Sequence, residues 1–119
     1  MGLAWRYKQG EGGKVLEGVL SDEDGAINLS GWTVTVTASK SVGGDEVISS
    51  ASCAIDADQS ANTGKITFTL DGTTANLDAN ENGYFLEFTG VAPGGAIFRF
   101  PNRKAVEQSY GRLIVRKSL

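Results

Sequence analysis

DEDGAINLSGWTVTVTA, residues 22–38, combines an acidic turn at Asp24-Gly25 with a segment of unbroken alternation. Its apolar positions are Trp32, Val34, Val36 and Ala38, and its polar positions are Thr33, Thr35 and Thr37. A repeat of two residues is typical of a strand with one buried and one solvated face. The stretch therefore predicts a small antiparallel β domain.

The rest of the chain repeats this pattern in short segments separated by turn residues. We expect strands at 3–9, 14–21, 32–39, 47–55, 65–70, 83–89, 96–100 and 111–117. Serine-rich 47–55 is expected at an edge or half-exposed. Residues 71–82 suit a helical turn or irregular crossover capped by Asp71 or Thr73. No stretch of ten or more residues has helical spacing, so the pattern predicts an all-β sandwich or barrel.

The length of 119 residues suits one domain, 1–119, in which residues 1–9 form an N-terminal arm or an edge strand. No apolar run approaches the roughly 18 residues that span a bilayer, so no membrane contact is expected. The single cysteine, Cys53, excludes an internal disulfide, and we expect it to be a small buried apolar residue.

Charge is distributed unevenly along the chain. The net charge is −3, which argues against nucleic acid as a partner. Residues 1–98 carry 13 acidic and 5 basic residues, a net of −8, whereas residues 99–119 carry six basic residues and Glu107 alone, a net of +5. Such a molecule could stack head-to-tail with its own copies; a solvated, basic last strand is the simpler alternative.

The usual catalytic and metal-binding constellations are missing from the sequence. There is no histidine, which removes Ser-His-Asp and Cys-His arrangements and histidine metal sites. Segment 10–14, GEGGK, lacks phosphate-loop spacing. Acidic residues cluster at 22–24 and at Asp56 and Asp58, where solvated turns are the simpler alternative to calcium. We expect neither an enzyme nor a cofactor.

Aromatic side chains are the remaining candidates for binding. Trp5, Tyr7 and Trp32 suit stacking on a sugar or insertion into a neighbouring subunit, and core packing is the alternative for Trp32. If the even-numbered apolar residues of 83–89 face the core, Phe85 faces outward, as an interface residue does. A strand buried on both faces is the alternative.

Several segments, taken in order, resemble the N-terminal immunoglobulin-like domain of phage baseplate upper proteins and related small virion proteins. The matching segments are KQGE (8–11), VLSD (19–22), DG (24–25), NLSGWTV (28–34), GKITF (64–68), GYFLEF (83–88), FP (100–101) and GRLIV (111–115). The resemblance spans nearly the whole chain and implies an immunoglobulin-like antiparallel β-sandwich of about seven or eight strands, with no catalytic residues.

The resemblance also implies a role in virion assembly at the baseplate, tail or neck, through contacts with other virion proteins and with copies of the chain itself. The expected interface residues are Trp5, Arg6, Tyr7, Phe85, Arg99, Arg103, Lys104, Arg112 and Arg116. A capsid decoration protein and a module that binds carbohydrate or another host-surface component are the alternatives. An N-terminal arm that swaps onto a neighbour predicts that removal of residues 1–9 lowers the oligomeric mass.

Overall fold

The computed structural model describes residues 4–22, 25–41, 44–100 and 111–117, and within these ranges the protein is all-β. Its strands are β1 (Ala4–Lys8), β2 (Val15–Val19), β3 (Ser21–Asp22), β4 (Gly25–Ala26), β5 (Thr33–Ser39), β6 (Glu46–Ile55), β7 (Lys65–Thr69), β8 (Asn80–Val91), β9 (Ile97–Phe100) and β10 (Gly111–Arg116). One 3₁₀ turn, η1 (Thr74–Asn76), precedes β8. The strands expected from alternation are therefore confirmed, with ends that differ by a few residues.

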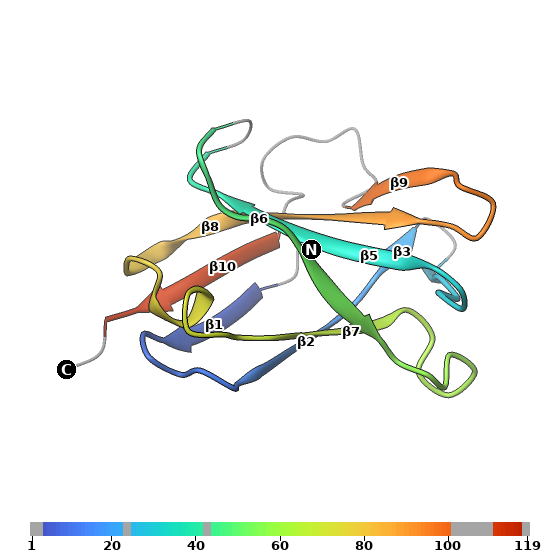
Figure 1. Cartoon of the computed structure of the whole chain (residues 1–119), viewed down its shortest axis with the longest axis horizontal. Helices are drawn as coiled ribbons and strands as arrows, with labels where there is room; N and C mark the ends of the chain where they lie inside the picture. The colour runs from blue at the N-terminus through green and yellow to red at the C-terminus, as the bar shows by residue number, and fades with distance from the viewer. Residues whose placement is uncertain (1–3, 23–24, 42–43, 101–110, 118–119) are drawn as a thin grey trace.

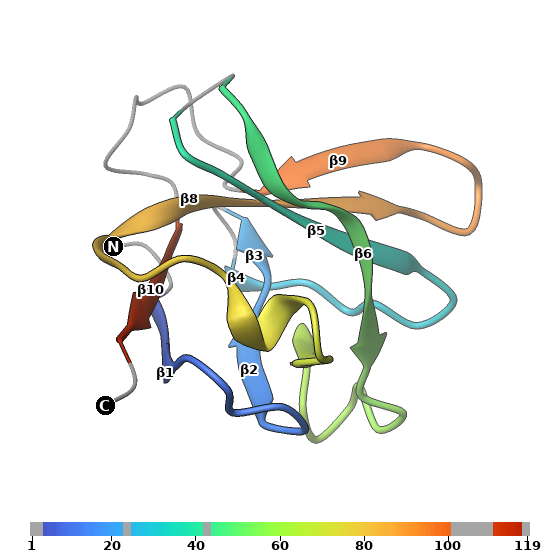
Figure 2. The same cartoon turned by 60° about the vertical axis from the view of Figure 1, so that its left-hand side comes forward.

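The strands form one antiparallel-rich sheet that curls almost into a barrel (Figures 1 and 2). Its order is β1-β10-β8-β5-β6-β7-β2, and β9 pairs with β8 beyond the end of β10. The pair β1–β10 is parallel, and every other pair is antiparallel. β3 and β4 form a separate small hairpin.

β5 lies in the middle of the sheet, as its alternation requires. Val34, Val36 and Ala38 are at most 1% exposed, and the threonines between them lie on the outer face. Seven consecutive residues of β5 pair with β8, from Thr33 opposite Val91 to Ser39 opposite Phe85. This register is fixed because a one-residue slip would turn the buried set toward solvent.

β6 joins the two halves of the sheet. Residues 46–53 pair with β5, and Ala54 and Ile55 pair with β7. Of the two alternatives predicted for 47–55, the edge strand is wrong, since β6 has a neighbour on each side, and the half-exposed strand is confirmed, since only Ile48 and Cys53 of β6 are buried. Within the part that pairs with β5, the strand is irregular at Ser50: this residue has a φ of 48° and donates its backbone N–H to Thr37 Oγ1 at 3.1 Å, where the pairing with β5 shifts.

The two ends of the sheet meet at Trp5, whose Nε1–H donates to the carbonyl of Glu17 in β2 at 2.8 Å. Trp5 stacks on Phe68, with ring centroids 6.0 Å apart, and meets Phe88 edge-on at 5.5 Å. The core thus lies between the β1 and β2 ends and the central strands β5 and β8. Cys53 belongs to it, as expected.

The segment before β8 contains the expected helical turn. Asp71 Oδ1 accepts hydrogen bonds from the backbone N–H groups of Thr73 and Thr74, which identifies Asp71 and not Thr73 as the capping side chain. These bonds, with one from the Thr74 hydroxyl, lower the pKa of the Asp71 carboxyl. β8 then begins at Asn80, three residues earlier than the sequence indicates.

Candidate interaction surfaces

Trp5 and Tyr7 are core residues, which corrects their expected place at an interface. They are 4% and 3% exposed, and the Tyr7 hydroxyl donates to the carbonyl of Thr74 at 2.6 Å. Alternation along β1 turns both rings inward, and pairing with β10 holds the strand in the sheet. Residues 4–8 are therefore part of the sheet and not an arm beside it, and removal of residues 1–9 would act first on folding.

Three of the expected basic interface residues lie together on the outer face of β1 and β10. Arg6 pairs in register with Ile114, and Arg116 pairs with Lys8; both arginines are exposed. Arg112, near the start of β10, is half-buried. It faces outward because its neighbour Leu113 is buried and adjacent residues of a strand point to opposite faces. The alternation of β1 and β10 thus builds a basic surface from residues that are more than a hundred positions apart.

Phe85 points outward from β8, as expected, but it is partly covered. The Arg112 guanidinium carbon lies 4.0 Å from the centroid of its ring, a cation–π contact between neighbouring strands. Arg112 Nη1 is buried and has no hydrogen-bond partner among the described residues. Phe85 and Arg112 therefore form one half-buried unit, and Phe85 is not an isolated exposed ring.

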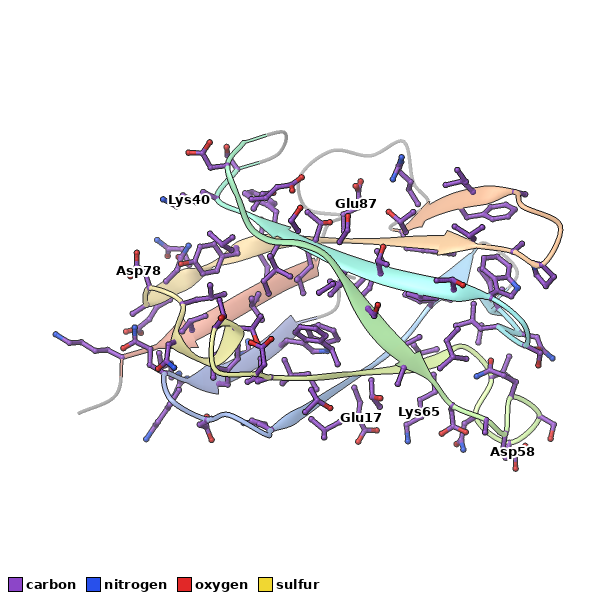
Figure 3. The ribbon with its side chains drawn as sticks, in the orientation of Figure 1. Glu17, Lys40, Asp58, Lys65, Asp78 and Glu87 are labelled. Carbon is purple, nitrogen blue, oxygen red and sulfur yellow. The ribbon has the colours of Figure 1, made fainter. Side chains whose placement is uncertain are left out.

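Arg99 lies on the same outer face, farther along β8. It is exposed on β9, pairs in register with Thr89, and donates Nη1–H to Thr89 Oγ1 at 2.9 Å. Glu87 lies between Thr89 and Phe85 on this face, and Figure 3 shows it on the side of the sheet away from the core. Arg103 and Lys104, the other two expected residues, lie outside the described residues.

Sequence reasoning missed an aromatic surface at the β8–β9 hairpin. The Trp32 ring lies on Gly90, where an added Cβ would be 2.9 Å from Cε3, and it meets the Phe98 ring at 5.3 Å. Phe98 is 41% exposed and Ile97 is 62% exposed. The sequence feature that indicates this surface is the dipeptide Ile97-Phe98. Two adjacent apolar residues place apolar side chains on both faces of a strand, so one of them is exposed when only one face is buried. We call Trp32, Ile97 and Phe98 the hairpin surface.

A hollow of about 310 Å³ lies beside Trp32. It is lined by Leu29, Ser30, Gly31, Trp32, Ile55, Asp56, Ala57 and Gln59. Gln59 fixes its shape, because the buried Oε1 accepts the N–H groups of Leu29 and Gly64, both at 2.9 Å, and Nε2 donates to the Asp56 carbonyl. The residues that line the hollow include the aromatic Trp32, the acidic Asp56 and the exposed Ser30.

The remaining polar groups support the fold. Asp58 accepts hydrogen bonds from Ser60 Oγ and the Ala61 N–H, which lower the pKa of its carboxyl. Burial raises the pKa of the Cys53 thiol to about 12. Lys65 Nζ lies 3.0 Å from Glu17 Oε1, and Figure 3 shows this pair joining β7 and β2. Within the described ranges, no three acidic or cysteine side chains are grouped to hold a metal ion.

No helix in the described part of the chain is both long and apolar enough to cross a bilayer. Comparison with protein-family models and with curated proteins gives no match to this sequence.

Proposed function

We propose that this protein is a structural component of a bacteriophage virion, an immunoglobulin-like module that joins virion proteins at the baseplate, tail or neck. The strand order is the observation that carries the proposal. β10-β8-β5 corresponds to the G-F-C sheet of an immunoglobulin domain, and β2-β7 with the end of β6 corresponds to B-E-D. In this interpretation β6 passes from one sheet of a sandwich to the other.

Two departures from the constant-type immunoglobulin order fit a module specialised for contacts. β1 pairs in parallel with β10 and not with β2, which leaves the opening between β1 and β2 closed mainly by the Trp5 side chain. The hairpin that ends in β9 is added between the strands that correspond to F and G. Additions of this kind change the surfaces that a sandwich presents without altering its core.

The surfaces of the described residues favour binding of proteins. The hairpin surface exposes large apolar side chains, and single-sign charge gathers on the outer face of β1 and β10. Aromatic residues and arginine are both enriched in protein interfaces. Opposite charge on the two parts of the chain, −8 for 1–98 and +5 for 99–119, adds electrostatic guidance to assembly.

Fractionation of phage particles tests this proposal. The protein is expected in density-banded particles from a culture that produces it, in the tail fraction after tails and capsids are separated, and at a copy number set by tail symmetry. Recovery with capsids would identify a decoration protein instead. Absence from purified particles would overturn the proposed function.

A carbohydrate-binding role is the second candidate, favoured by the hollow beside Trp32. Its lining combines a tryptophan, suited to stacking on a sugar, with the polar residues Ser30, Asp56 and Gln59. Trp32→Ala is expected to abolish binding on a glycan array while the circular dichroism spectrum stays unchanged. Trp5 is unsuitable for this test because it is buried, and Ile97→Ala is the control, because Ile97 is exposed and does not line the hollow.

A further inference from the structure

The outer edge of β9 is an exposed, apolar strand edge. Among the strands that the structure describes, only β8 pairs with β9, and Figures 1 and 2 show β9 at the margin of the sheet. Its sequence is IFRF, and Ile97 and Phe98 are 62% and 41% exposed. Exposed edges of this kind are templates for pairing with another chain.

The turn before β9 decides which backbone groups face outward. Ala92 N–H donates to the Ala96 carbonyl at 2.9 Å, so these two residues form a hydrogen-bonded pair. Hydrogen-bonded and non-hydrogen-bonded pairs alternate in an antiparallel ladder. Phe98 and Phe100 therefore turn their backbone groups toward β8, whereas Ile97 and Arg99 turn theirs toward the edge.

This edge is short, with four residues, which limits pairing between molecules, but it lacks the other features that usually prevent it. It contains no proline or lysine, and its one charged side chain, Arg99, is drawn back over β8 by the hydrogen bond to Thr89. The other two sheet ends differ in this respect. β1 carries Arg6 and Lys8 on its outer face, and β1 and β2 are linked to each other through Trp5.

We propose that a second copy of the chain pairs with this edge, β9 against β9 in antiparallel orientation, about a two-fold axis at Phe98. This inference rests on the proposed assembly role and names its partner. In this register Ile97 lies opposite Arg99 of the second copy. The outward-facing backbone N–H and carbonyl groups of Ile97 then form hydrogen bonds with those of Arg99 of the second copy, and the reverse pair does the same. The two Phe98 side chains lie opposite each other beside the two Trp32 rings.

The neighbouring registers fit less well. An axis at Arg99 places two guanidinium groups opposite each other, which is destabilising. An axis at Ile97 leaves Arg99 opposite the turn residue Gly95. The register centred on Phe98 avoids both faults and adds an aromatic cross-strand pair.

The pairing is a weak one. Four residues on each side bury far less than the roughly 1,200 Å² of a stable interface, so the dimer is expected to form only at high concentration in solution. Assembly on a particle holds copies close together, which raises the effective concentration at each contact. The contact is therefore suited to organising copies that other interfaces have already brought together.

Disulfide trapping tests the register directly. Opposed residues of a non-hydrogen-bonded pair have Cα atoms about 4.5 Å apart, within the range of a disulfide. Oxidised Phe98→Cys is expected to give a covalent dimer at a rate that rises with concentration. Ile97→Cys and Arg99→Cys are expected to cross-link with each other when mixed and much more slowly alone. Cys53 is buried and remains as the background thiol.

A charge substitution tests the contact without cysteine. Ile97→Lys places an ammonium group opposite Arg99 of the second copy and is expected to weaken self-association about tenfold or more. Adding Arg99→Glu is expected to restore it. Val19→Lys is the matched control, because Val19 is 56% exposed on β2, away from the edge. Sedimentation equilibrium over a wide concentration range measures all four proteins.

The outcomes separate this inference from the proposed function. Cross-linking of Phe98→Cys that is no faster than that of Val19→Cys would overturn the two-fold pairing. So would equal effects of Ile97→Lys and Val19→Lys on self-association. If the protein nevertheless occurs in purified particles, the assembly role stands and only the choice of a second copy as partner fails.

Discussion

At the scale of single residues, Gly90 shows how one missing side chain shapes a surface. The Trp32 ring occupies the space that a side chain at position 90 would fill, since an added Cβ would lie 2.9 and 3.0 Å from its Cε3 and Cζ3 atoms. Glycine in a strand often marks such a close approach. The position of Trp32, and with it the hairpin surface and the hollow, depends on this contact.

We predict that Gly90→Ala displaces Trp32 and lowers the free energy of unfolding by about 1–3 kcal/mol, the usual cost of overpacking. Chemical denaturation followed by tryptophan fluorescence measures both effects. Gly94→Ala is the control, because no atom lies within 4 Å of a Cβ at that turn position and its effect is expected to be small. Equal stability of the two variants would contradict the contact.

Tyr7 predicts a dependence on alkaline pH. Burial, with a smaller contribution from Tyr84, raises the pKa of its phenol to about 12, whereas an unfolded tyrosine titrates near pH 10. The unfolded state therefore loses its proton first. The contribution of Tyr7 to the free energy of unfolding is fully present below pH 10 and is lost as pH rises from about 10 to 12.

The prediction is checked with urea denaturation at several pH values. Tyr7→Phe is expected to be less stable at neutral pH, since the Thr74 carbonyl loses its donor, and to lose less stability between pH 10 and 12 than the parent protein. Cys53, whose thiol pKa is also raised, contributes in the same direction and is present in both proteins. Identical alkaline slopes would show that Tyr7 is not responsible.

At the scale of elements, β6 is irregular at Ser50, where its pairing with β5 shifts. A non-glycine residue with a φ of 48° costs about 1–2 kcal/mol, and glycine removes this cost at an entropic loss of about 0.5–1 kcal/mol. We predict that Ser50→Gly raises the free energy of unfolding by about 0.5 kcal/mol. The backbone bond to Thr37 is retained.

Ser52→Gly is the control for this prediction, because Ser52 is an exposed residue that pairs regularly with Thr35. Glycine at a regular strand position is expected to lower stability by about 0.5–1 kcal/mol. Thermal unfolding of the two variants should therefore shift in opposite directions. A shift in the same direction would mean that the positive φ of Ser50 carries no steric cost.

The elements themselves could be predicted from the sequence, but their neighbours could not. Alternation located β5, β7 and the inward side of β8, because the pleat of a strand alone sets its period. The parallel pairing of Ala4 with Arg112 joins residues that are distant in the chain, and no local pattern encodes it. For the same reason Trp5 and Tyr7 were predicted at an interface, whereas both rings lie in the core once β1 is paired with β10.

The candidate surfaces follow the same division. Alternation predicts that the Phe85 side chain faces outward. That Arg112 covers it depends on the register between β10 and β8, which no local pattern gives. The hairpin surface was missed because the sequence predicts only a short strand at 96–100. Within it, Ile97-Phe98 breaks the alternation of apolar and polar residues that a half-buried strand needs. Adjacent apolar residues in a short strand near a Pro-Gly-Gly turn are the signal for such a surface.

At the scale of the whole molecule, the sheet is almost a closed barrel, and the Trp5 side chain links its two end strands. β1 and β2 are the two ends of the sheet order, and the Trp5 indole N–H, 2.8 Å from the Glu17 carbonyl oxygen, links them. The same ring packs on Phe68 and Phe88 in the core. Trp5 thus contributes to closure by packing and by a hydrogen bond, which substitutions can separate.

We predict that Trp5→Phe, which keeps an aromatic ring, lowers the free energy of unfolding by about 1–3 kcal/mol, because the Glu17 carbonyl loses its donor. Trp5→Ala is expected to cost about 3–5 kcal/mol, since it also leaves a cavity. Hydrogen exchange should quicken in β1 and β2 of the Trp5→Phe protein and stay unchanged in β5 and β8, because only the opening loosens. Trp32→Phe, the same replacement away from this opening, is expected to leave exchange in β1 and β2 unaltered. Uniformly faster exchange in all strands of Trp5→Phe would show that Trp5 stabilises the core as a whole and does not act as a local link between the two ends of the sheet.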